Sequence, residues 1–130
     1  MTSQMSNTKT VMKYLLAFLF VAAGINHFIN PDMYLRIMPP YLPWPLFLQY
    51  LAGFFEILLG VLVLIPRYSR MAAWGLILLL IAVFPANIEM ALNPDKYPEF
   101  SPIAYYIRLP IQFLIIAWAW WYTKKNATPA

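Results

Sequence analysis

Four long apolar stretches, separated by short polar connections, dominate the pattern of hydrophobic and polar positions along the chain. They cover about residues 11–29, 46–65, 71–92 and 103–122. A helix rises about 1.5 Å per residue, so about 20 apolar residues cross a hydrocarbon layer about 30 Å thick. The pattern predicts four transmembrane helices. Little chain remains for anything else, and we expect a single all-α domain over residues 1–130, an integral membrane four-helix bundle.

Prolines predict two departures from regular helix. Residues 37–45 contain four prolines, and proline lacks the amide hydrogen that helices and sheets need. This segment is therefore expected to be an apolar cap on the rim of the bundle, neither helix nor strand. Pro85, inside the third stretch, is expected to kink that helix.

The composition agrees with lipid as the solvent. Hydrophobic residues make up 62% of the 130 residues and charged residues 11%, outside the usual range of soluble domains. The net charge is +4, but the basic residues lie at the ends of the apolar stretches and form no single surface stripe. We therefore expect no nucleic-acid partner. The chain has no cysteine, which excludes disulfides and thiolate metal sites.

Charges in the connections predict the orientation, because short cytoplasmic segments are rich in Lys and Arg. One side, which includes both termini, carries only bases: Lys9, Lys13, Arg67, Arg70, Lys124 and Lys125. The other side carries mostly acids: Asp32, Arg36, Asp95, Lys96 and Glu99. Both termini are expected to be cytoplasmic. An alternative is a signal peptide cleaved after Val21-Ala22-Ala23, but the apolar sequence continues past Ala23 and its loss would break the charge symmetry.

Polar side chains inside the spans gather in the half of the bundle away from the termini, which we call the outer half. They are Asn26, His27, Glu56, Asn87, Glu89, Arg108 and Gln112. Each is costly in hydrocarbon, by about 2.5 to 3.5 kcal/mol for charged residues, so each needs a partner or a function. We predict a buried polar network, with Arg108 paired to Glu56 or Glu89. Gly53 and Gly60 share the helix face of Glu56 and are expected to let a neighbouring helix pack closely.

Three functions are compatible with such a network. It can be purely structural; it can line a pocket for the polar head of an amphipathic molecule; or it can carry protons in a transporter. A single histidine cannot supply the ligands of a haem, copper or zinc site, so no metal is expected. We find no phosphate-binding glycine loop and no nucleophile elbow. Catalytic residues cannot be assigned, and the balance is against an enzyme.

Five short segments carry a resemblance to a known family. They are 23–28 (AGINHF), 31–40 (PDMYLRIMPP), 53–60 (GFFEILLG), 84–91 (FPANIEMA) and 108–112 (RLPIQ). In this order they make the chain, from about Lys13 to Tyr122, resemble the DoxX family of small bacterial four-helix membrane proteins.

The resemblance implies a multi-pass protein of the bacterial cytoplasmic (inner) membrane. It connects some members with quinol oxidation or electron transfer to quinone, and others with oxidative-stress complexes. We therefore expect a non-catalytic subunit or amphipathic-ligand-binding bundle, accessory to a quinone-linked respiratory or redox-defence system. A quinone or a lipid would be its ligand, with no intrinsic cofactor, and a redox protein or a second copy its partner. The alternatives are a quinol-using oxidoreductase component that needs a partner, and a proton-coupled transporter.

Overall fold

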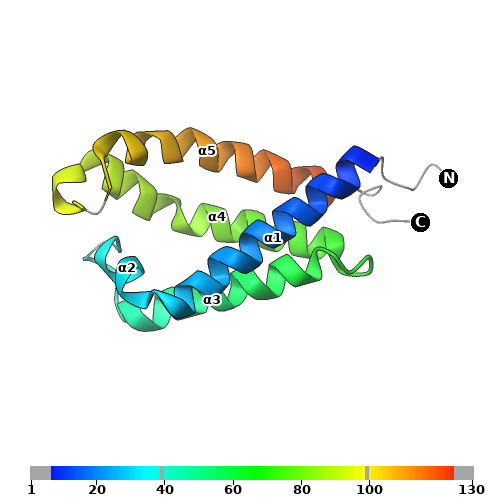
Figure 1. The fold of residues 1–130 in the computed structure, drawn as a ribbon, viewed down its shortest axis with the longest axis horizontal. Coiled ribbons are helices and arrows are strands. Elements are labelled where there is room, and N and C mark those ends of the chain that lie inside the picture. Colours follow the sequence, from blue (N-terminus) through cyan, green and yellow to red (C-terminus); the bar gives the residue numbers. More distant parts are fainter. Residues whose placement is uncertain (1–6, 39, 99, 125–130) are drawn as a thin grey trace.

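The computed structural model describes residues 7–38, 40–98 and 100–124, and all its regular elements there are helical. In chain order they are α1 (Asn7–Ile29), α2 (Pro31–Arg36), α3 (Pro45–Leu62), α4 (Ser69–Leu92), η1 (Pro94–Lys96), α5 (Pro102–Trp120) and η2 (Trp121–Thr123) (Figure 1). Four of them, α1, α3, α4 and α5 with η2, are long and apolar enough to cross a membrane. The predicted all-α four-helix bundle is confirmed.

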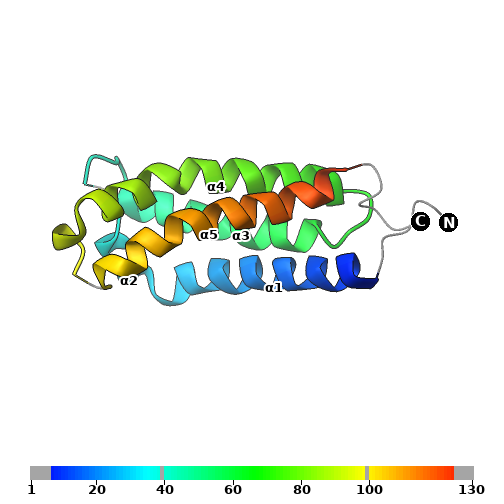
Figure 2. The same cartoon turned by 90° about the horizontal axis from the view of Figure 1, so that it is seen from above.

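The start of α1 and the end of η2 lie at one end of the bundle, and α2 and η1 lie at the other (Figures 1 and 2). We call these the terminal end and the loop end. Basic residues Lys9, Arg70 and Lys124 belong to the terminal end and Asp32 and Asp95 to the loop end, as four antiparallel spans require.

Proline and a capping serine set several helix starts. Pro45 and Pro102 occupy the first turns of α3 and α5, where the missing amide hydrogen removes no helical bond. The Ser101 hydroxyl accepts a hydrogen bond from the Ala104 amide at 3.4 Å. The short helix α2, which starts at Pro31, was not predicted. Pro85 lies inside α4, which continues to Leu92.

The proline-rich segment, predicted over residues 37–45 to be neither helix nor strand, is irregular at its described residues up to Trp44, whereas Pro45 already begins α3. Trp44 has φ 46°, in the left-handed region, and its side chain is 73% exposed. Ile37, in contrast, is buried against Met90 and Ala91 of α4. The segment therefore covers the loop end of the bundle with its first residue and exposes its last ones.

The helices are arranged so that each packs on the next in the order α1, α3, α4, α5. This order leaves a seam between the first and last helices. At the terminal end the seam is fastened by the Tyr122 hydroxyl, which donates to the Lys9 carbonyl at 2.8 Å. Toward the loop end, Figure 1 shows α1 and α5 diverging.

Small residues set the close packing of α1 on α3. A Cβ atom at Gly24 would lie 2.6 Å from the Gly53 carbonyl, and one at Gly60 would lie 3.2 Å from the Ala17 carbonyl. The predicted packing roles of Gly53 and Gly60 are therefore confirmed. Gly24 is a packing residue that the sequence analysis missed. Ala17 and Gly24 are seven residues apart, as are Gly53 and Gly60, so two antiparallel helices bring the small residues opposite each other.

Two separate apolar cores fill the bundle. The larger lies toward the terminal end and includes Leu16, Phe20, Leu76 and Tyr122. The smaller lies at the loop end, around Met90, Tyr97 and Tyr105. In α4 the residues between the two cores include Pro85 and Asn87. The interior is thus interrupted where the sequence places its polar residues.

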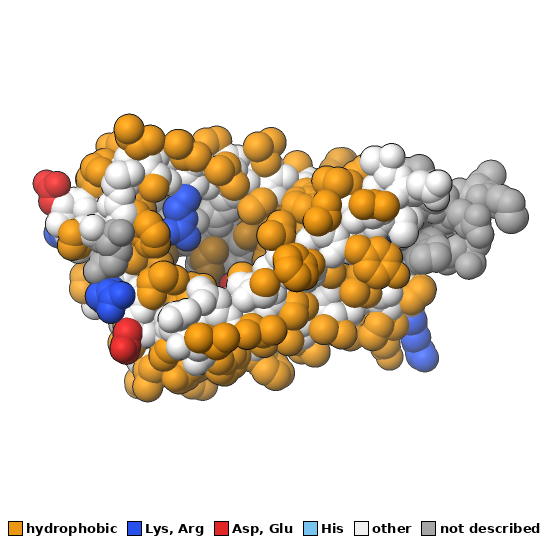
Figure 3. Space-filling model, viewed as in Figure 1, with side chains coloured by type: hydrophobic (Ala, Val, Ile, Leu, Met, Phe, Trp, Pro, Cys, Tyr) orange, Lys and Arg blue, Asp and Glu red, His pale blue; other side chains and the backbone are white. Residues whose placement is uncertain are grey.

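Large apolar side chains cover the flanks of the bundle (Figure 3), among them Phe18, Phe54, Leu78, Phe113 and Leu114, each more than half exposed. In water such a surface would be unfavourable, whereas lipid solvates it. The protein is a multi-pass membrane protein.

Candidate ligand-binding site

A hollow lies between the two apolar cores and is visible on the face of the bundle in Figure 3. It consists of two adjoining cavities of about 350 and 460 Å³. Both are lined by Glu56, Val83, Asn87 and Arg108. The first lies in the seam between α1 and α5, and the second extends under α2. In Figure 3 a basic side chain lies at the rim of the hollow and an acidic one inside it.

Glu56 is held in the interior by His27. The His27 Nε2 atom lies 3.3 Å from Glu56 Oε2, and the two side chains are 9% and 14% exposed. His27 and Glu56 each follow a packing glycine by three residues, so the close approach at Gly24 and Gly53 brings the two side chains together. Of the predicted network, the structure thus brings His27 and Glu56 together.

Two further side chains orient the His27 ring. The Gln49 Oε1 atom lies 3.3 Å from His27 Nδ1. Tyr34 stacks on the ring with centroids 3.7 Å apart, and burial raises the pKa of the Tyr34 phenol. With the Gln49 oxygen toward the ring, each ring nitrogen of His27 lies near an oxygen atom, Nδ1 near Gln49 Oε1 and Nε2 near Glu56 Oε2.

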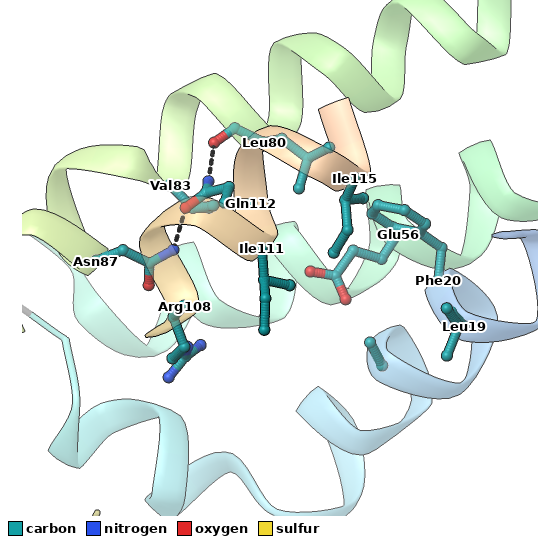
Figure 4. Close-up of a pocket in the computed structure, with 11 residues that line it drawn as sticks. Leu19, Phe20, Glu56, Leu80, Val83, Asn87, Arg108, Ile111, Gln112 and Ile115 are labelled. Carbon is teal, nitrogen blue, oxygen red and sulfur yellow. Dashed lines mark hydrogen bonds between the residues drawn. The ribbon is translucent and has the colours of Figure 1, made fainter. Parts of the chain in front are cut away.

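The expected ion pair of Arg108 is not formed. Among residues 7–38, 40–98 and 100–124, no hydrogen bond or ion pair joins Arg108 to another side chain. Glu56 contacts His27 instead, and Glu89 accepts hydrogen bonds from Asn93 and Tyr97. Both predicted partners of Arg108 were wrong, because the sequence does not show how each helix is rotated about its axis. The guanidinium is exposed at the edge of the hollow, where Figure 4 shows it pointing away from Glu56.

The wall of the hollow opposite α1 and α3 is made by two amides. The Asn87 Nδ2 atom donates to Gln112 Oε1, and Gln112 Nε2 donates to the Leu80 carbonyl at 2.5 Å (Figure 4). Gln112 is buried and therefore fastens α5 to α4 at the level of the hollow. Asn87 and Gln112 were predicted to share a network, and they do.

Asn26 and Glu89, also predicted as site residues, lie outside the lining of the hollow. The Asn26 amide donates to the Tyr34 hydroxyl at 2.8 Å, so it supports the site through Tyr34. The Tyr97 hydroxyl donates to Glu89 Oε2 at 3.2 Å. Burial and then the neighbouring Glu89 raise the pKa of Tyr97 to about 12, which keeps this hydroxyl a donor. Glu89 and Asn87 point to different sides of α4, as their spacing predicts.

The sequence analysis missed two residues of the site, Gln49 and Tyr34. Gln49 is buried and only 1% exposed, and it precedes Glu56 by seven residues on the same helix face. That spacing could have identified Gln49 as a site residue from the sequence. Tyr34 lies in the unpredicted helix α2, and no pattern in the sequence indicated that it folds back onto His27.

A double-mutant cycle tests the amide wall. Gln112→Leu alone leaves the Asn87 amide without its acceptor, and Asn87→Leu alone removes one of the two bonds of Gln112. We therefore expect the double variant to be less destabilised than the sum of the singles. The expected coupling is about 0.6 kcal/mol and at most about 1.7, the range measured between membrane helices. Thermal unfolding in a mild detergent, followed by circular dichroism, measures it, and strictly additive effects would contradict the bond.

Comparison with known proteins yields a family but no activity. The model of a family described as a domain of unknown function (DUF8561) matches residues 16–123. No curated protein and no solved structure matches the chain.

Proposed function

The chain belongs to the DUF8561 family, and we propose that it is a membrane protein that binds an amphipathic molecule from the bilayer. The observation that carries this proposal is a hollow at the seam between α1 and α5, lined by one acid and one base that do not pair with each other. Leu19 and Ile111, on opposite sides of the seam, are exposed. A ligand therefore has an apolar entrance from the side.

The energetics favour a ligand over a purely structural network. In a self-sufficient network each polar group satisfies another. Here the Glu56 Oε1 atom is buried without a hydrogen-bond partner in the described chain, and Arg108 also lacks one. A polar group without a partner in an apolar environment costs free energy that a bound head group would recover. The volume lies in the range of small-molecule sites, about 300 to 1,000 Å³.

The resemblance to the DoxX family supplies the physiological setting of the proposal. It supports a location in the bacterial cytoplasmic membrane and a role accessory to a quinone-linked respiratory or redox-defence system. The Lys and Arg residues at the terminal end support cytoplasmic termini. A quinone or a lipid is then the ligand. A redox protein or a second copy of the chain would be the partner.

A second function, a proton-handling component of a quinol-using oxidoreductase, is favoured by one contact. His27 Nε2 and Glu56 Oε2 lie 3.3 Å apart next to the hollow, the arrangement expected of a residue pair that receives protons from a substrate. In that function a partner protein supplies the redox centre. Such activity would appear only after the partner is added.

The binding proposal is tested by mass spectrometry of organic extracts from protein purified in mild detergent. We expect wild type to retain an amphipathic molecule near one per chain. The Arg108→Ala, Glu56→Gln double variant should lose it, because both polar anchors of the hollow are removed. Arg67→Ala with Asp32→Asn is the matched control, since it makes the same change of charge at two exposed residues outside the hollow.

The identity of the molecule separates the alternatives. A quinone that the control retains and the double variant loses would support the redox setting. If no molecule is enriched in wild type, or if the double variant retains it as well as the control does, the hollow is not a ligand site.

A further inference from the structure

The polar groups that border the hollow occupy different depths in the bundle. Arg108 is the seventh residue of α5 and Glu56 the twelfth of α3, both counted from the loop end. At 1.5 Å per residue, Glu56 lies about 7 Å deeper than Arg108. Figure 4 shows the same order: Arg108 and Asn87 lie on one side, Glu56 in the middle, and Leu19 and Phe20 on the other.

The deeper group offers a hydrogen-bond acceptor. His27 Nε2 faces only Oε2 of Glu56, and Oε1 is buried with no partner. Because Glu56 meets His27 through Oε2, the lone pairs of Oε1 remain available to accept a hydrogen bond. A ligand group that donates at this depth, such as a hydroxyl or an amide N–H, would satisfy this atom.

The shallower group offers a cation. Arg108 carries a permanent charge with donors arranged to bind carboxylate or phosphate in a bidentate manner. It lines both cavities and is engaged by no acid of the described residues. An anionic group on the ligand would fill this position, and the aqueous rim at the loop end is the side on which the head of a bilayer amphiphile lies.

Beyond Glu56 the hollow is apolar. Its lining there includes Leu19 and Phe20, on the far side of Glu56 from Arg108 (Figure 4) and next to the larger of the two cores. Along the depth of the bundle the hollow thus presents first a cation, then a hydrogen-bond acceptor, then hydrocarbon. This order matches one amphiphile in its ordinary orientation in a bilayer leaflet.

We propose that the ligand is a single-chain anionic amphiphile with its acid group at Arg108 and a hydroxyl or amide N–H at Glu56 Oε1. Lysophosphatidic acids and N-acyl amino acids both have this chemistry, with the acid outermost and the donor between the acid and the chain. Two cavities of about 350 and 460 Å³ that share four lining residues suit one chain better than the two chains of a bilayer phospholipid. This inference rests on the proposed binding function and specifies its ligand class.

The test uses the full-length protein, washed free of lipid in mild detergent, and four probes with the same sixteen-carbon chain. Palmitoyl lysophosphatidic acid has an acid and a hydroxyl, palmitate has only the acid, and monopalmitoylglycerol has only hydroxyls. Dipalmitoyl phosphatidic acid adds a second chain and removes the hydroxyl. Native mass spectrometry measures the bound fraction of each. We expect the lysophosphatidic acid to bind about tenfold more tightly than any other probe, the effect of one charge-assisted hydrogen bond.

Variants assign each preference to one residue. Arg108→Gln should remove the advantage of lysophosphatidic acid over monopalmitoylglycerol and leave its advantage over palmitate. Glu56→Ala should remove the advantage of lysophosphatidic acid over palmitate and leave its advantage over monopalmitoylglycerol. Arg67→Gln, at the terminal end, should bind as wild type does. The order of affinities of the four probes for wild type is itself a test. The inference can therefore be judged even if a variant fails to fold.

Three results would overturn the inference: equal binding of all four probes, tighter binding of the two-chain lipid, or preferences unchanged in both pocket variants. If wild type retains a quinone but does not discriminate among the probes, the inference fails and the proposed binding function stands. If the protein binds no amphiphile at all, both fail.

Discussion

Gly24→Ala is expected to destabilise the bundle strongly. The added Cβ atom would lie 2.6 Å from the Gly53 carbonyl and 2.9 Å from the Ile57 amide nitrogen, so it meets backbone atoms that cannot rotate away. The contact between α1 and α3 must open, at a cost of about 1 to 3 kcal/mol or more. Because His27 reaches Glu56 through this contact, ligand binding should weaken with stability. Thermal unfolding in mild detergent measures the first effect and native mass spectrometry the second.

Gly75→Ala is the matched control. It is the same substitution in another spanning helix, but the added Cβ atom meets only the Leu59 side chain, whose Cδ2 atom lies at 2.8 Å. A leucine end can change rotamer, and alanine favours the helix over glycine by about 1 kcal/mol. We expect little loss of stability or a small gain. An equal loss in the two variants would show that α1 and α3 are not packed as closely as described.

The second large effect concerns the partner of Glu56. His27→Leu should destabilise the protein by about 3 kcal/mol, because breaking a buried pair leaves an uncompensated carboxylate. Glu56→Leu should cost less, since His27 keeps its contacts with Gln49 and Tyr34. In the double variant the stranded carboxylate is gone, so we expect much of the loss to be recovered. Unfolding of all four proteins in one detergent measures the cycle.

The outcome of this cycle separates two accounts of Glu56. Recovery in the double variant would establish His27 as the group that holds the carboxylate in the interior. If the double variant is as unstable as the sum of the singles, His27 stabilises the bundle by packing against Gly53 and not by pairing. Arg108→Ala should leave the cycle unchanged, because it contacts neither residue of the pair.

Several features of the site were predictable residue by residue. Asn87, Gln112, His27 and Glu56 were identified because polar side chains are rare in lipid-spanning helices. Gly53 and Gly60 were identified by spacing. Ala17 and Gly24 have the same seven-residue spacing as Gly53 and Gly60. They could have been identified in the same way and were missed.

Which polar groups meet was not predictable. Arg108 was expected to bind an acid, yet Glu56 contacts His27, and Glu89 accepts a hydrogen bond from Tyr97. One helix turn holds residues that face all directions, and each pairing depends on the rotation of two helices. The fold of α2 onto His27 likewise depends on contacts between segments and not on local preference.

The sequence by itself determined the four spans, their alternating direction and the level at which the polar residues lie. Each of these follows from local requirements: apolar length against bilayer thickness, charge beside each end, and the cost of polar atoms in hydrocarbon. Only the tertiary structure decided that α1 and α5 leave a seam, that glycine contacts bring His27 to Glu56, and that Arg108 faces the resulting hollow. Those are set by the order and rotation of the helices, because packing between distant segments selects among arrangements that lipid solvates equally well.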